Sequence, residues 1–134
     1  MMSRLLMILI LASVSASPAQ ALDDALTVKL EAMNNSGQSG FATLFPEGEK
    51  TRVVIELLNT PPGVAQPAHI HAGRCDTLDK APKWPLEALK GGRSVTLVPV
   101  SLDAILQDKT AINIHKSAAE VQVYVACGNI VGVM

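Results

Sequence analysis

The sequence has few of the residues that carry chemistry, with three histidines and two cysteines among its 134 residues. It also lacks an excess of one charge, because 11 Lys and Arg stand against 12 Asp and Glu. This balance favours neither nucleic acid nor an anionic membrane surface as a partner. The apolar run at residues 5–14 is well short of the roughly 20 residues that a spanning helix needs. The sequence therefore predicts no nucleic-acid partner and no membrane-spanning helix.

Residues 1–21, "MMSRLLMILILASVSASPAQA", have the pattern of a secretory signal peptide. Arg4 supplies the positive charge before the apolar run, and Ala19-Gln20-Ala21 matches an A-x-A cleavage site. The mature chain should begin near Leu22, and residues 22–134 are long enough for one domain with one core. We therefore expect an exported protein, periplasmic or secreted, with no membrane insertion after cleavage of the signal.

Export also decides how the two cysteines are interpreted. An oxidising compartment allows cysteines to pair, whereas a cytosolic chain would keep them reduced. Cys75 and Cys127 are the only cysteines in the chain. The sequence therefore predicts a disulfide bond between them.

The remaining chain shows alternation of apolar and polar residues rather than helical spacing. Short runs rich in β-branched residues are separated by Gly, Pro and Asn turns. These patterns predict strands in the segment of His69 and His71 and at residues 26–33, 40–45, 51–58, 94–102, 111–117 and 121–130. Seven or so short strands with turns between them favour an all-β fold, a Greek-key sandwich or barrel.

Two segments depart from the strand pattern. In residues 101–108, "SLDAILQD", Ser101 is a possible N-cap before apolar Leu102, Ile105 and Leu106, so one or two helical turns are expected. Residues 76–92 are long, rich in proline and weakly patterned, and they follow Cys75. We expect a long loop here, anchored by the disulfide, because connections of this length are usually functional or mobile.

The three histidines fit one face of the predicted strands. Successive side chains of a strand point to opposite faces, so His69 and His71 share one face while Ile70 points to the other. In "AINIH", Ile112 and Ile114 suit the core, which leaves His115 on the outer face with Asn113. Three imidazoles held by rigid strands supply the neutral nitrogen ligands that a divalent metal prefers. The pattern predicts a metal site of His69, His71 and His115.

The order "HIH…C", "INIHKSA" and "VACGNIVGV" resembles the copper/zinc superoxide dismutases across most of the mature chain. That family has an H-x-H of copper ligands, a cysteine in the next loop, a further ligand His in a "VVHE"-like strand, and a closing "ACGVIG" strand. The resemblance implies a Greek-key β-barrel, one copper ion per chain, and copper-ligand roles for His69, His71 and His115.

The chain departs from this family on the zinc side of the site. Lys83, in "APKWPL", stands where the family has a histidine that bridges copper and zinc, and no histidines remain for the other zinc ligands. Ala119 replaces a supporting Asp, and Tyr124 replaces the Arg that steers superoxide. We therefore expect copper without zinc. Lys83, Trp84 and Tyr124 are candidates to surround the metal, although Trp84 also suits packing.

Several functions fit this pattern. The first is copper binding, as handling of the ion or residual redox chemistry, with superoxide or a copper donor or acceptor protein as partner. A working copper-only superoxide dismutase is the enzyme alternative, with Arg74, Lys83 or Lys116 attracting the anion or remaining ordinary surface charges. A three-histidine zinc enzyme is another, although only Glu120 and Asp76 are candidate bases. The last alternative is a structural module that binds no metal.

Overall fold

The computed structural model describes residues 8–14 and 24–132. Within these residues the structure has eight strands and one helix: β1 (Leu26–Ala32), β2 (Gly40–Glu47), β3 (Lys50–Leu57), β4 (Gln66–Ala72), β5 (Pro82–Leu89), β6 (Arg93–Val98), α1 (Leu102–Gln107), β7 (Thr110–His115) and β8 (Tyr124–Ile130). In the predicted signal peptide, residues 1–7 and 15–21 lie outside the described residues, so that prediction stays open. Within the described part, no helix is both long and apolar enough to cross a membrane.

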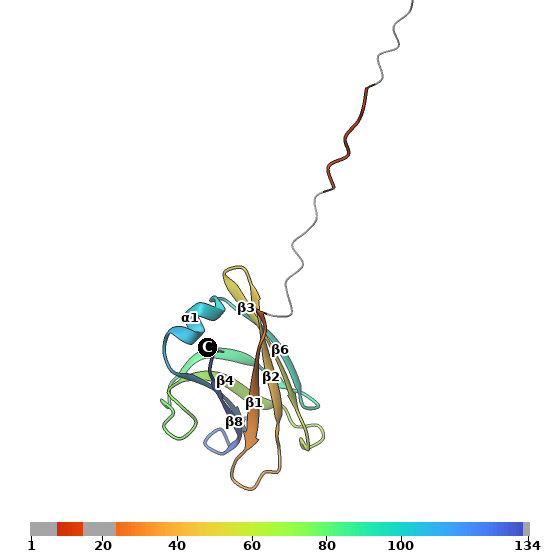
Figure 1. The fold of residues 1–134 in the computed structure, drawn as a ribbon. Helices are drawn as coiled ribbons and strands as arrows, with labels where there is room; N and C mark the ends of the chain where they lie inside the picture. The colour runs from red at the N-terminus through yellow and green to blue at the C-terminus, as the bar shows by residue number, and fades with distance from the viewer. Residues whose placement is uncertain (1–7, 15–23, 133–134) are drawn as a thin grey trace, which may run out of the picture.

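The strands form one sheet in the order β5-β4-β7-β8-β1-β2-β3-β6. The two end strands also meet, because the backbone N–H of Glu87 donates to Thr96 Oγ1 at 2.8 Å and Ser94 Oγ donates to the Glu87 carbonyl at 2.7 Å. The sheet therefore curves into a nearly closed barrel (Figure 1). The connections from β3 to β4 and from β6 to β7 each pass over two strands, which is a Greek-key crossing. The predicted all-β fold is confirmed.

The barrel interior is filled by alternate residues of the strands. In β1, Leu26, Val28 and Leu30 are buried, while the residues between them are exposed. Ile112 and Ile114 of β7 enter the same core. Burying a Leu or Ile side chain stabilises the fold by about 1.5–3 kcal/mol. This alternation leaves the opposite face of β4 and β7 free for polar side chains.

The helix forms where the sequence predicted it. The side chain of Ser101 accepts a hydrogen bond from the backbone N–H of Ala104 at 3.1 Å, which caps the first turn. Ile105 is fully buried in the core, and Leu102 and Leu106 pack against it. The short helix therefore contributes to the same core as the strands.

The expectation of a loop over the whole of residues 76–92 was wrong in its second half. Residues 82–89 form β5, which pairs with β4 through Ile70 and Trp84 among others. Pro82 and Pro85 hid this strand from a pattern search because proline cannot donate a ladder hydrogen bond. β5 is an end strand of the sheet, where proline is tolerated. The loop anchored by the disulfide is therefore shorter than predicted and spans residues 73–81.

Candidate metal centre

Strand alternation and register bring the three histidines to one face. Ile70 lies in the core, so His69 and His71 lie on the outer face of β4. The register pairs His69 with Asn113, which is two residues before His115 on β7. The two halves of the predicted site, separated by more than 40 residues in sequence, therefore occupy neighbouring strands.

The three imidazoles converge to within the reach of a single ion. His69 Nδ1 lies 3.0 Å from His115 Nε2, and one ligand nitrogen from each ring lies within 4.8 Å of the others. His71 and His115 are buried, and His69 is half-buried. Two nitrogens bound to one metal at about 2 Å are at most about 4 Å apart. Small ring movements therefore suffice for all three to bind one ion.

A backbone carbonyl sets the proton position on His71. Its Nδ1 lies 2.8 Å from the carbonyl oxygen of Asp79, which can only accept, so Nδ1–H donates. The neutral ring then carries its lone pair on Nε2. That nitrogen is buried and has no hydrogen-bond partner among the described residues. A metal ion is a partner that suits this orphaned lone pair.

His115 is held in the same way by a different loop. Its Nδ1 donates to the carbonyl of Val121, which leaves the lone pair of the neutral ring on Nε2. The loop of residues 116–123 is closed by the backbone bond from Lys116 N to Val123 O at 2.8 Å. Such carbonyl partners fix both the orientation of a ligand ring and the nitrogen that it offers.

Burial favours the neutral forms of His69 and His115. Burial lowers the pKa of His69, and the nearby His115 and His71 lower it further. Burial also lowers the pKa of His115, although its hydrogen bond to the Val121 carbonyl acts in the opposite direction. Neutral imidazole is the form that binds metals, so these shifts favour metal binding near neutral pH.

A pocket of about 530 Å³ opens in front of the histidines. Its other lining residues are Lys80, Pro82, Val121, Gln122 and Tyr124. No carboxylate is among these described residues. An ion held by the histidines would therefore have room for a small molecule on one side, next to an ammonium group, an amide and a phenol.

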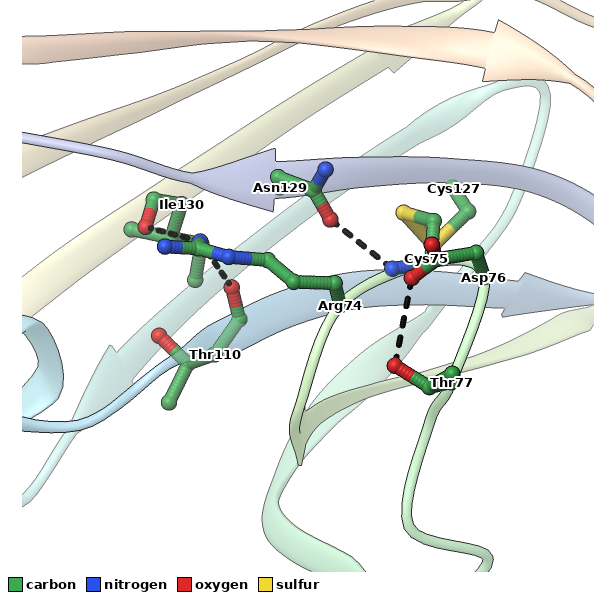
Figure 2. The surroundings of a disulfide bond; sticks show 8 residues. All are labelled: Arg74, Cys75, Asp76, Thr77, Thr110, Cys127, Asn129 and Ile130. Atoms are coloured by element: carbon green, nitrogen blue, oxygen red, sulfur yellow. Dashed lines mark hydrogen bonds between the residues drawn. A yellow bond between two sulfur atoms is a disulfide. The ribbon is translucent and has the colours of Figure 1, made fainter.

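The predicted disulfide is present and fastens the loop that supports His71. Cys75 and Cys127 are bonded across a sequence separation of 52 residues. Cys75 N–H also donates to Asn129 Oδ1 at 2.8 Å, and Arg74 reaches the Ile130 carbonyl at 3.2 Å (Figure 2). Both contacts tie the start of the loop of residues 73–81 to β8.

Backbone hydrogen bonds also hold this loop to the end of β4 and to the residue that precedes β7. The backbone N–H of Asp79 donates to the Ala72 carbonyl at 2.9 Å, and Gly73 N–H donates to the Lys109 carbonyl at 2.8 Å. Gly73 has a φ of +99°, and a Cβ there would lie 2.5 Å from the Thr77 carbonyl oxygen. Glycine at position 73 therefore lets the loop fold back and present the Asp79 carbonyl to His71.

The residues predicted to surround the metal separate into two groups. Tyr124 lines the pocket, and its ring packs edge-on against His115 with the centroids 5.2 Å apart. Lys83 instead pairs with Asp108 at 3.6 Å, and Trp84 packs against the core. Neither is among the described residues that line the pocket. β5 therefore directs Lys83 toward Asp108 and Trp84 toward the core, in agreement with the packing role that Trp84 also suited.

The cations proposed to attract an anion are also engaged elsewhere. Arg74 binds backbone carbonyls near the disulfide, and Lys116 pairs with Glu120 at 3.1 Å. The cation that lines the pocket is Lys80, which sequence reasoning missed. Nothing in the pattern of residues 76–81 marks it, because its position depends on how the loop folds.

Comparisons with protein-family models, with curated proteins and with solved structures found no match to this chain.

Proposed function

We propose that this protein is an exported copper-binding protein in which His69, His71 and His115 hold one copper ion. The observation that supports this most is the convergence of three nitrogen donors, two of them with carbonyl-bound Nδ1–H groups. The affinity of nitrogen sites for divalent metals generally reaches its maximum at copper. The motif resemblance to the copper/zinc superoxide dismutases points to the same metal.

The proposal assigns a role to the groups that orient the ligand rings and another to the pocket in front of them. The carbonyls of Asp79 and Val121 orient two rings, while the disulfide and Gly73 hold the loop that carries Asp79. When bound, copper would supply one-electron redox chemistry. The pocket beside Tyr124 admits a small molecule or a ligand from a donor protein. Binding and transfer of copper require only these ligands and an accessible pocket, so copper handling is our first proposal.

Superoxide dismutation is the second candidate, and Lys80 is the observation that favours it. An ammonium group at the pocket wall would attract a small anion toward the ion. A zinc hydrolase has less support, because Glu120 is paired with Lys116 and Asp76 accepts from Thr77 Oγ1 at 3.2 Å. No carboxylate among the described residues lines the pocket to serve as a general base.

Metal analysis of the protein purified from its native compartment tests this proposal. We expect about one copper per chain, nitrogen-dominated ligation in the Cu(II) electron paramagnetic resonance spectrum, and tighter binding of Cu(II) than of Zn(II). His71→Ala should weaken binding greatly, whereas Gln122→Ala, a control on the pocket wall, should not. Wild-type copper affinity in the triple His→Ala variant would overturn the assignment.

A further inference from the structure

Asn113 is a buried polar residue for which the fold gives no structural partner. Its side chain is fully buried, and neither Oδ1 nor Nδ2 has a hydrogen-bond partner among the described residues. Burying an unpaired amide costs about 1–3 kcal/mol. Its neighbours Ile112 and Ile114 enter the core, so Asn113 lies on the outer face, the face of the histidines. An unpaired amide at this position needs an explanation.

The register places Asn113 between the copper ligands. It is paired with His69 on β4 and lies two residues before His115 on its own strand. Directly opposed residues have Cβ atoms about 4.5–5.5 Å apart, and residues at i and i+2 share one face of a strand. The carboxamide therefore lies beneath the two rings whose nitrogens are 3.0 Å apart.

Asn113 is not among the described residues that line the pocket. A molecule that enters the pocket would meet Lys80, Gln122 and Tyr124 instead. On its other side Asn113 is paired with Cys127 of β8, whose sulfur is in the disulfide, so an ion held by the histidines is left as the partner for its oxygen on the sheet side. The unpaired Nε2 of His71 belongs to the histidine cluster, so one ion would take lone pairs from both this nitrogen and the Asn113 oxygen, while the Nδ2 donor stays unpaired.

We propose that Asn113 Oδ1 is a fourth, weak oxygen ligand of the copper ion, bound on the side of the site that faces the sheet. This inference rests on the proposed copper site and extends it from three ligands to four. Carboxamide oxygens serve as weak axial ligands in other copper proteins, where they tune the potential of the metal. Asn113 would leave the pocket side open for an exogenous ligand.

The test compares Asn113→Leu, which removes the oxygen at similar volume, with Asn113→Asp, which retains it. In Asn113→Leu we expect Cu(II) affinity to fall by roughly 10-fold, a loss typical of groups that tune a metal site. The copper hyperfine splitting and the d–d absorption band should shift, with the nitrogen signals of the three histidines retained. Asn113→Asp should keep or raise the affinity. Gln66→Met, a change at another buried polar residue, should leave the spectra unchanged.

Stability of the metal-free protein separates a ligand from a structural residue. Because the amide has no partner in the fold, Asn113→Leu should unfold at the same or a higher urea concentration than wild type in the presence of a chelator. Wild-type spectra and affinity in Asn113→Leu would overturn this proposal and leave the three-histidine site intact. Failure of Asn113→Leu to fold would also contradict it, unless Asn113→Asp folds and shifts the copper spectrum. A wild-type protein that binds no copper would remove the proposed function itself.

Discussion

His69 Nδ1 and His115 Nε2 face each other at 3.0 Å across β4 and β7. Since the Val121 carbonyl holds the proton of His115 on Nδ1, the Nε2 of the neutral ring accepts and His69 donates. Protonating His115 would place two N–H donors face to face. In this pair of tautomers the contact requires a neutral His115, and metal binding replaces it.

The stability of the metal-free protein should depend on pH, mainly because burial disfavours the charged forms of His69 and His115. The pKa values of His69 and His115 are lowered in the folded state, so the unfolded chain binds protons more readily below its pKa of about 6.5. The free energy of unfolding should therefore be highest above about pH 6.5 and fall as pH falls toward the lowered values. Urea titrations with a chelator at several pH values measure this.

The variant His69→Gln/His115→Gln provides the control for that measurement. It keeps polar side chains at both positions and removes both titrating groups. The free energy of unfolding of wild type minus that of this variant should decrease as the pH is lowered. A difference that stays constant or grows at low pH would contradict the expected sign.

The disulfide should support copper binding as well as stability. Cys75 and Cys127 close a long loop of chain, which in the loop-entropy model stabilises the fold by roughly 4 kcal/mol at most. The same bond anchors the loop that presents the Asp79 carbonyl to His71. In Cys75→Ser/Cys127→Ser we expect lower stability and copper affinity reduced about 10- to 100-fold, as for lost support of a ligand.

This prediction is measured by competition with a copper chelator at a temperature where circular dichroism shows the variant folded. Alkylation of unfolded, unreduced wild-type protein should label no thiol. Equal copper affinity in the folded variant and wild type would show that the loop holds its position without the bond.

Gly73→Ala should weaken copper binding although Gly73 is not a metal ligand. A Cβ at Gly73 meets the Thr77 carbonyl, so the loop must move and carry the Asp79 carbonyl away from His71. Gly63 is the matched control, because its φ is +70° and nothing lies within 4 Å of its Cβ position. Both changes should cost about 1–2 kcal/mol of backbone strain. Only Gly73→Ala should weaken copper binding, which isothermal titration would measure; equal affinities would refute the role of the loop.

Copper-loaded protein should be a slow superoxide dismutase. The histidines offer a site open to the pocket, but Lys80 is the one cation among the described lining residues, and Tyr124 adds a phenol rather than a second cation. Stopped-flow decay of superoxide, with a chelator to silence free copper, should give rates well below the diffusional ceiling of about 10⁹ M⁻¹s⁻¹. Lys80→Gln should lower the rate and reduce its dependence on ionic strength.

Metal-free protein and copper-treated His115→Ala are the controls for that measurement. Both should give only the background decay of superoxide. A wild-type rate near the ceiling, lost in His115→Ala, would make the protein an enzyme rather than a copper-handling protein.

The strand pattern was enough to predict the barrel and the histidine face. Alternation is a local property: once Ile70 and Ile114 enter the core, the directions of His69, His71 and His115 follow from the pleat. The pairing of Cys75 with Cys127 also followed from counting, because the chain holds two cysteines. Local sequence patterns were therefore sufficient to predict which histidines form the candidate metal site.

Tertiary structure decided what surrounds those donors. Proline in β5 masked a strand that exists because its partner β4 supplies the pairing, and this strand turns Lys83 away to Asp108. The fold of the loop of residues 73–81 places Lys80 at the pocket and the Asp79 carbonyl at His71. These contacts join residues through loops without periodicity, so no local pattern encodes them. The unpaired state of Asn113 likewise depends on which strands lie on either side of it.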